Sequence, residues 1–364
     1  MLTLTQRLQA EIDRANITTN GSDTTVHDAI SSLIDGYGKS EDYLAQKITN
    51  TLTEYTNNDV TSIGNYAFNS CTSLTSISFP AVTDVGNYTF GDCSSLSSID
   101  LPALTNIGTC GFVRCSSLTS VNLQSVTNTG TSVFSECTSL TTVDLPALTS
   151  LDGMVFYNCT KLKSVNLPAV TSISSASNFA GCSLLTDVNL PAIIDISGSN
   201  TFYNCTSLTS VNLRAVTNIG TGCFGGCSSL TSIDLPLITT LGSSSFSSCK
   251  LLTSVNLPLV TSVGSGAFAS CKALTSIDLP SLTSIGGSGF YNCTKLSTLI
   301  LRSSTLCELT NTNAFSSSGI ASGTGYVYVP SNLVDSYKNA ANWSTYANQI
   351  RAIEDYPDVC GVVK

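Results

Sequence analysis

The stretch from Leu140 to Lys161 reads LTTVDLPALTSLDGMVFYNCTK, and its pattern returns along most of the 364-residue chain. Each copy carries a phenylalanine and, three residues later, a cysteine, at intervals of 22 or 23 residues. The phenylalanines are Phe68, Phe90, Phe112, Phe134, Phe156, Phe179, Phe202, Phe224, Phe246, Phe268 and Phe290, and the cysteines are Cys71, Cys93, Cys115, Cys137, Cys159, Cys182, Cys205, Cys227, Cys249, Cys271 and Cys293. An unbroken series with one period identifies a repeat protein.

The pattern within one copy predicts two short strands and a return segment. Val143 and Leu145 alternate with Asp144, which is typical of a half-buried strand, and Pro146 is expected to end it. Residues 148–151 predict a second, shorter extended segment. The F-x-x-C segment is expected to be a short helical or 3₁₀ return that points both side chains inward. Recurrent glycines are expected to mark a turn with positive φ; they are Gly64, Gly86, Gly108, Gly220, Gly242, Gly264 and Gly286.

A single copy cannot bury its apolar stripe, so neighbouring copies must stack into a continuous core. The sequence therefore predicts a β-rich (α+β) repeat solenoid, a leucine-rich-repeat-like stack of about 12 turns with strands ~4.8 Å apart. We expect a helical N-terminal head or cap at residues 1–58, the solenoid at 59–330 and a C-terminal cap at 331–364. Truncating a ladder phenylalanine such as Phe202 to alanine is expected to leave a cavity.

The self-aligned consensus L-x-x-I-x-L-P-x-L-x-x-I-G-x-x-x-F-x-x-C resembles the bacterial BspA/Treponema-type leucine-rich repeat, over roughly residues 61–330. This resemblance implies a leucine-rich-repeat stack that acts as a binding protein. The unit is usually 22 residues long, whereas 23 is commoner in this type. Gln124, Arg214 and Arg302 replace the proline, and we expect them to shift the local curvature without changing the architecture.

Composition excludes several classes of function. Charged residues make up 11% of the chain, the net charge is −9 and His27 is the single histidine. An acidic chain is a poor partner for nucleic acid, and no apolar run approaches the ~18 residues that membrane insertion requires. No G-x-S-x-G motif, P-loop or quartet of metal ligands is present. We therefore expect no enzymatic activity, no catalytic residues, no bound metal and no cofactor.

The cysteine ladder allows two interpretations, reactive or structural. Neighbouring cysteines would lie ~4.8 Å apart, within the range that a disulfide tolerates. In-register side chains, however, point in parallel toward the core, so we expect buried free thiols. Cys223 and Cys227 lack the second pair of ligands that a zinc ribbon requires.

Polar residues also form rows. The position between the two apolar residues of the strand is expected to face solvent. Aspartate never occupies this position in two adjacent turns, which avoids repulsion between stacked carboxylates. The alternative interpretation is a row of oxygen acceptors that binds calcium. That row is Ser78, Asp100, Asn122, Asp144, Asn166, Asn189, Asn212, Asp234, Asn256 and Asp278. Threonine rows suggest ice binding, but β-propensity and solubility explain them better.

Candidate ligand-binding residues lie where the self-alignment breaks. The two residues after each phenylalanine vary most, two residues interrupt Thr/Ser positions of the strand, and one arginine replaces the consensus proline. These candidates are Arg114, Glu136, Tyr157, Tyr203 and Tyr291 after the phenylalanines, Lys163 and Asp187 on the strand, and Arg214 at the proline position. Exposed tyrosines combine rigid area with a polar tip and suit sugar or protein. The alternative is neutral drift on a solvated edge.

The two ends differ from the repeats. Residues 1–58 have helical patterns and are weakly similar to the heads of prophage tail proteins, so they predict either a cap or a head for attachment to a virion partner or for oligomerisation. Ser331 is expected to cap a helix that ends at Ala340, with Trp343, Tyr346, Ile350 and Ile353 as apolar cover. This end resembles the closing module of BspA-type repeats.

These features predict a non-enzymatic binding scaffold. The first hypothesis is a phage or prophage tail-associated protein that recognises a protein or surface glycan of a bacterial cell, and is virion- or cell-associated, because no signal peptide is visible. The alternative is a bacterial cell-surface adhesin that binds host protein or glycan.

Overall fold

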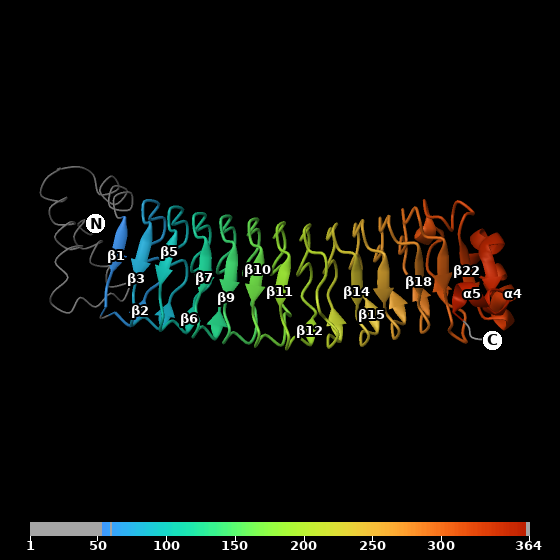
Figure 1. The fold of residues 1–364 in the computed structure, drawn as a ribbon, viewed down its shortest axis with the longest axis horizontal. Coiled ribbons are helices and arrows are strands. Elements are labelled where there is room, and N and C mark those ends of the chain that lie inside the picture. Colours follow the sequence, from blue (N-terminus) through green and yellow to red (C-terminus); the bar gives the residue numbers. More distant parts are fainter. Residues whose placement is uncertain (1–52, 59, 362–364) are drawn as a thin grey trace, which may run out of the picture. The chain divides into compact units, whose positions relative to one another are not determined.

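The computed structural model describes residues 53–58 and 60–361, and these form two compact units that meet in sequence at Ala169 and Val170. Each unit is a stack of turns, and every turn contributes short strands to the stack (Figure 1). The first unit contains main-sheet strands β1 (Glu54–Thr56), β3 (Ser76–Ser78), β5 (Ser98–Asp100), β7 (Ser120–Asn122), β9 (Thr142–Asp144) and β10 (Ser164–Asn166), and second-sheet strands β2 (Ser62–Ile63), β4 (Asp84–Val85), β6 (Asn106–Ile107) and β8 (Asn128–Thr129).

The second unit repeats this arrangement. Its main-sheet strands are β11 (Asp187–Asn189), β14 (Ser232–Asp234), β16 (Ser254–Asn256), β18 (Ser276–Asp278), β20 (Thr298–Ile300), β22 (Tyr326–Val329) and β23 (Ile350–Ala352). Its second-sheet strands are β12 (Asp195–Ile196), β13 (Asn218–Ile219), β15 (Thr240–Leu241), β17 (Ser262–Val263), β19 (Ser284–Ile285) and β21 (Glu308–Leu309). A 3₁₀ helix, η1 (Thr312–Phe315), replaces the usual loop near the end.

Strand pairing confirms that one repeat is one wrap of the chain. All pairs within each unit are parallel, and residues one period apart are partners, as Val143 with Val165 and Leu241 with Val263. The predicted leucine-rich-repeat-like stack is therefore confirmed, with about 14 turns in place of the expected 12. Strand β1 falls in the range expected to be a head and pairs with β3; residues 1–52 of that range lie outside the described residues.

The phenylalanines form the centre of each core. Their rings are buried and stacked on those of the neighbouring turns, with Phe112 and Phe134 5.5 Å apart between ring centroids and Phe202 5.3 Å from both Phe179 and Phe224. Interplanar angles between stacked phenylalanines of neighbouring turns are 13° or less. This arrangement confirms that, within each unit, a phenylalanine lies directly against that of the preceding turn.

We expect Phe202→Ala to lower the free energy of unfolding by about 3–5 kcal/mol, because the ring is fully buried between two others and its loss leaves a cavity. Urea denaturation followed by circular dichroism measures the change. Phe202→Leu, which fills part of the space, is the control and is expected to lose less. A loss below about 1 kcal/mol for the alanine variant would contradict the proposed role of the ring stack.

The F-x-x-C segment is not helical, so that part of the prediction is wrong. Around Phe112 the chain makes two tight turns, with Cys110 and Arg114 at φ 57° and 55°, and the same two positions have positive φ in each of the other loops. The loop N–H groups of Cys110, Phe112 and Arg114 donate to carbonyls of the next turn at 2.8–2.9 Å. A helix would use these donors internally, and the stack would lose its hydrogen bonds in this layer. Both side chains do point inward, as expected.

The recurrent glycines mark turns but do not have positive φ, so that expectation is also wrong. Glycine is required here because the backbones of successive turns lie close together. A Cβ built on Gly108 would lie 2.6 Å from the carbonyl carbon of Gly86, and one on Gly264 would lie 2.6 Å from the carbonyl oxygen of Leu241. Successive turns meet backbone to backbone at this corner, and any side chain would separate them.

The C-terminal segment closes the second unit. It comprises η2 (Ser331–Leu333), α4 (Val334–Asn339), η3 (Trp343–Gln349), β23, η4 (Ile353–Asp355) and α5 (Pro357–Cys360). Trp343 and Tyr346 are buried against Phe315, at 5.8 and 5.3 Å between ring centroids, and the Trp343 indole N–H donates to the Cys307 carbonyl at 2.7 Å. Ser331 lies inside η2 and does not cap a helix, which corrects the prediction; its N–H donates to Glu354 at 3.0 Å.

Candidate ligand-binding surface

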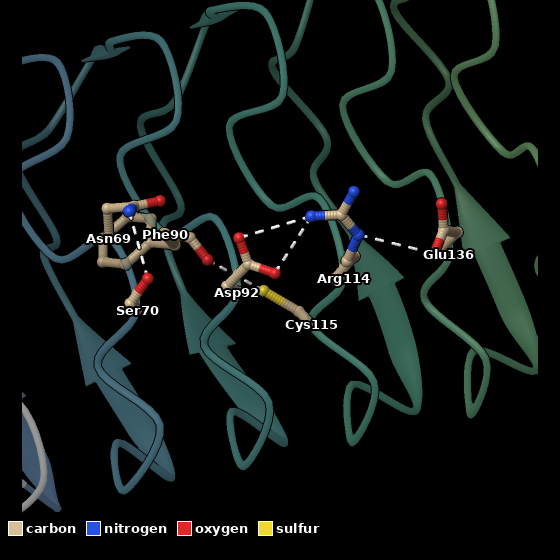
Figure 2. A network of polar contacts seen from close by, with 7 residues as sticks. All are labelled: Asn69, Ser70, Phe90, Asp92, Arg114, Cys115 and Glu136. Carbon is tan, nitrogen blue, oxygen red and sulfur yellow. Dashed lines mark hydrogen bonds and ion pairs between the residues drawn. The ribbon is translucent and has the colours of Figure 1, made fainter.

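The cysteine ladder is structural. All cysteines of the described residues are free and buried, as expected. The Cys115 thiol donates to the Phe90 carbonyl of the preceding turn at 3.2 Å (Figure 2), and thiols in both units repeat this bond. Burial raises the pKa of Cys137 to about 12, so the thiols are protonated donors at neutral pH and weak nucleophiles. The described residues contain no cluster of three or more His, Cys, Asp or Glu that could hold a metal ion.

The threonine rows are hydrogen-bond ladders. Hydroxyl groups donate to the backbone carbonyl of the equivalent residue one turn earlier, as Thr105 to Thr83 at 3.0 Å and Thr283 to Thr261 at 2.9 Å. A second row does the same beside the main sheet, where Thr253 donates to Thr231 at 3.1 Å. These hydroxyls join the turns together, which explains their recurrence more directly than β-propensity and solubility.

The aspartates of the outer strand row accept hydrogen bonds from neighbouring turns. Asp144 accepts from the Asn166 amide at 2.7 Å and from Gln124 at 2.9 Å. Asparagine in this row is therefore a donor to the carboxylate as well as an uncharged spacer between two carboxylates.

The three residues that replace the consensus proline share this function. Gln124 and Arg214 each reach an aspartate of the following turn, since the Arg214 guanidinium lies 3.1 Å from Asp234. Arg302 reaches the preceding turn and forms two bonds to one oxygen of Asp278, at 2.9 and 2.8 Å. Each departure from the consensus thus supplies a donor to a carboxylate; its effect on curvature stays a prediction.

Arg114 and Glu136 belong to one ion-pair network. Both occupy the left-handed position two residues after the phenylalanine, and the Arg114 guanidinium lies between two carboxylates, 3.2 Å from Asp92 and 3.4 Å from Glu136 (Figure 2). The hydrogen bond that Arg114 donates to the Asp92 carboxylate raises the pKa of Arg114. These side chains are partly exposed but satisfy one another, so they are weaker candidates for ligand contacts than the sequence suggests.

We expect Arg114→Met to lower the free energy of unfolding by less than about 1 kcal/mol, because both ion pairs are exposed and screened by water. Urea denaturation of the wild type, Arg114→Met, Asp92→Asn and the double variant measures the coupling. A coupling above about 2 kcal/mol would show that the network stabilises the loops more than solvent exposure allows.

The other candidates are divided between two surfaces. We define the loop edge as the residues from two before to two after each phenylalanine. On the loop edge, Tyr203 and Tyr291 are 44% and 43% exposed, and Tyr157 is half-buried. Lys163 precedes β10, Asp187 begins β11 and Arg214 lies in a turn before β13; all three are exposed. Among the eight candidates, Arg114 and Glu136 form an ion pair with each other.

Two loop-edge features were missed. Tyr66 is 53% exposed and stacks on Tyr88, with 5.2 Å between ring centroids and an interplanar angle of 4°. The second feature is a run of glycines after Tyr203, in the sequence TGCFGGC at residues 221–227. The loss of three side chains from one loop edge was visible in the self-alignment and could have directed attention to it.

The parallel stacked turns with inward leucines define a leucine-rich repeat solenoid. The chain belongs to the family described as "BspA type Leucine rich repeat region (6 copies)", whose model matches residues 46–163, 145–252 and 239–342. No curated protein matches the chain.

Solved structures include similar repeat proteins. A leucine-rich repeat protein from Bacteroides ovatus is 29% identical, with 83% of this chain and 84% of that chain covered and a TM-score of 0.63. A leucine-rich cell surface protein from Faecalibacterium prausnitzii is 22% identical, covering 81% and 92%, with a TM-score of 0.46. The Treponema pallidum leucine-rich repeat protein is 29% identical over 43% of this chain and 71% of that chain, with a TM-score of 0.38. No helix in the described part of the chain is long and apolar enough to cross a bilayer.

Proposed function

We propose that the chain is a non-enzymatic binding scaffold whose loop edge recognises a protein or glycan on a bacterial cell surface. One observation carries this proposal: the thiols and threonine hydroxyls that recur along the repeats bond within the stack, whereas some of the side chains that vary are exposed at the loop edge. Thiols and hydroxyls bond to carbonyls of the preceding turn. Tyr203 and Tyr291 instead present rings to solvent, on a surface that stacked repeats hold rigid.

The chemistry of the repeats supports a binding function over catalysis. Burial keeps the pKa of the ladder thiols high, with Cys137 and Cys293 at about 12, so these groups are not activated nucleophiles. Carboxylates of the outer row accept hydrogen bonds from amides or guanidinium groups. Family membership agrees, because solenoid repeats serve widely as extended recognition surfaces.

Two kinds of particle could carry this scaffold, a phage virion or a bacterial cell. In the first hypothesis the chain is a phage or prophage tail-associated protein and a virion partner holds residues 1–58. In the second it is a bacterial cell-surface adhesin that binds host protein or glycan. Immunoblots of purified phage particles and of washed cell envelopes distinguish them: signal in particles supports the first, and signal in envelopes alone supports the second.

Binding itself is tested with the full chain, fluorescently labelled, and intact cells from a panel of bacterial and host types in flow cytometry. We expect saturable binding to at least one cell type that unlabelled protein displaces. An acidic globular protein of similar size, labelled to the same degree, is the control. Binding no stronger than this control on every cell type would overturn the proposed function.

A further inference from the structure

The loop around Phe224 lacks side chains at the positions where its neighbours carry them. Gly222, Gly225 and Gly226 occupy the places two before, one after and two after this phenylalanine, and no other repeat has glycine at all three. The preceding loop, around Phe202, carries large side chains at the same three places. Successive turns in the second unit stack in register, so these two loops are direct neighbours.

The side chains of the Phe202 loop lie across the glycines of the Phe224 loop. A Cβ built on Gly225 would lie 3.0 and 3.2 Å from ring carbons Cδ2 and Cε2 of Tyr203, and Gly225 is buried. A Cβ on Gly222 or Gly226 would overlap the side-chain oxygen of an asparagine from the Phe202 loop. We call this arrangement the Tyr203 platform: Asn200, Tyr203 and Asn204 lying on Gly222, Gly225 and Gly226.

The surroundings of the platform are small and uncharged. Tyr203 remains 44% exposed. One turn earlier, Ala180 and Gly181 occupy the positions that correspond to Tyr203 and Asn204, and the loop one turn after the glycines contains serines. The loops at residues 175–182, 199–205, 221–227 and 243–249 contain no charged residue. This loop edge therefore differs from that of the first unit, where Asp92, Arg114 and Glu136 pair with one another.

A flat ring beside two amides matches the chemistry of a neutral sugar. The apolar C–H face of a pyranose packs against an aromatic ring, and its hydroxyl groups both donate to and accept from amide groups. A charged ligand would find no counter-charge in these loops. A stable protein partner requires about 800 Å² of buried surface around a central anchor, whereas Tyr203 is an isolated ring among glycine, alanine and serine.

We infer that the Tyr203 platform binds a neutral saccharide, with the Tyr203 ring against the sugar face and Asn200 and Asn204 bonding its hydroxyl groups. This inference rests on the proposed function and names its ligand class. It gives Gly225 a definite role, because the missing Cβ allows the tyrosine ring to lie close against the backbone of the next turn.

The test applies the full chain to an array of neutral bacterial and host oligosaccharides and measures affinity for the bound sugars by calorimetry. Tyr203→Ala is expected to weaken binding at least about tenfold, and Tyr203→Phe, which keeps the ring, is expected to weaken it less. Gly225→Ala leaves the tyrosine present but displaces its ring, and is also expected to weaken binding. Tyr356→Ala is the control, since Tyr356 is 39% exposed but lies between η4 and α5, outside the loop edge.

Each result bears on a different claim. The inference is supported if Tyr203→Ala and Gly225→Ala weaken sugar binding, Tyr356→Ala leaves it unchanged and the thermal melting curves of all three variants stay unchanged. Sugar binding that Tyr203→Ala leaves unchanged overturns the platform. Protease-sensitive binding to cells without binding to any arrayed neutral sugar overturns the saccharide and leaves the proposed function intact. Absence of binding to any cell overturns the proposed function and this inference with it.

Discussion

Unfolding between about pH 9 and pH 11 is the largest effect we expect from a change of conditions. Burial raises the pKa of Cys71 to about 11 and those of Cys137 and Cys293 to about 12, and it raises those of other ladder thiols in the same direction. An unfolded cysteine titrates near pH 8.5. Above that pH the unfolded chain loses thiol protons that the folded chain retains, so the free energy of unfolding falls as the pH rises.

The expected fall in the free energy of unfolding is large because many buried cysteines contribute to it. Each thiol that stays protonated only in the folded state increases the unfolding constant by up to about tenfold per pH unit. Burial also raises the pKa of Tyr337 to about 12, which adds a contribution of the same sign above pH 10. The stabilisation is fully present below about pH 8.5 and is lost as the pH approaches the folded-state pKa values.

Equilibrium urea denaturation at a series of pH values from 7 to 11, under reductant and without oxygen, measures this slope. Cys115→Ser is the matched control: it keeps a hydrogen-bond donor toward the Phe90 carbonyl but removes one group that titrates in this range. We expect its slope against pH to be smaller by about one proton. A free energy of unfolding that stays constant from pH 8 to pH 10.5 would contradict the prediction.

Deletion of residues 331–364 is the second large change, and we expect aggregation or loss of soluble expression. Strand β22 pairs with β23 through Val327 with Ile350, so the deletion leaves one edge of β22 unpaired. It also uncovers Phe315, which Trp343 and Tyr346 contact. An open strand edge beside exposed aromatic rings is a template for association between chains.

Size-exclusion chromatography with light scattering measures the outcome. Trp343→Ala is the comparison variant, because it removes the buried indole and its bond to the Cys307 carbonyl but retains β23 over the strand edge. We expect that variant to stay soluble and to lose about 3–5 kcal/mol of stability. A soluble, monomeric and fully folded product of the deletion would refute the capping role of this segment.

Several features of the candidate surface could not be predicted from the sequence, because they depend on contacts between turns. Arg114 and Glu136 are separate candidates in the sequence, yet Arg114 bridges Asp92 and Glu136 across three turns. Gln124, Arg214 and Arg302 read as lost prolines, whereas each is a donor to an aspartate about one turn away. The wrong prediction of a helix in the F-x-x-C segment has the same origin. A helix requires N–H groups that donate to carbonyls within the segment, whereas here they donate to carbonyls of the next turn.

The sequence by itself determined the period, the parallel stack and the inward phenylalanine and thiol columns, because a 22-residue spacing places identical side chains at identical positions in every turn. Only the tertiary structure decided which contacts neighbouring turns make with each other. It showed that Gly108 allows the backbone to approach that of Gly86, that threonine hydroxyls donate to carbonyls of the preceding turn and that Tyr203 lies on Gly225. These contacts join residues 22 or more positions apart, and their geometry follows from the offset between turns, which residue spacing alone does not specify.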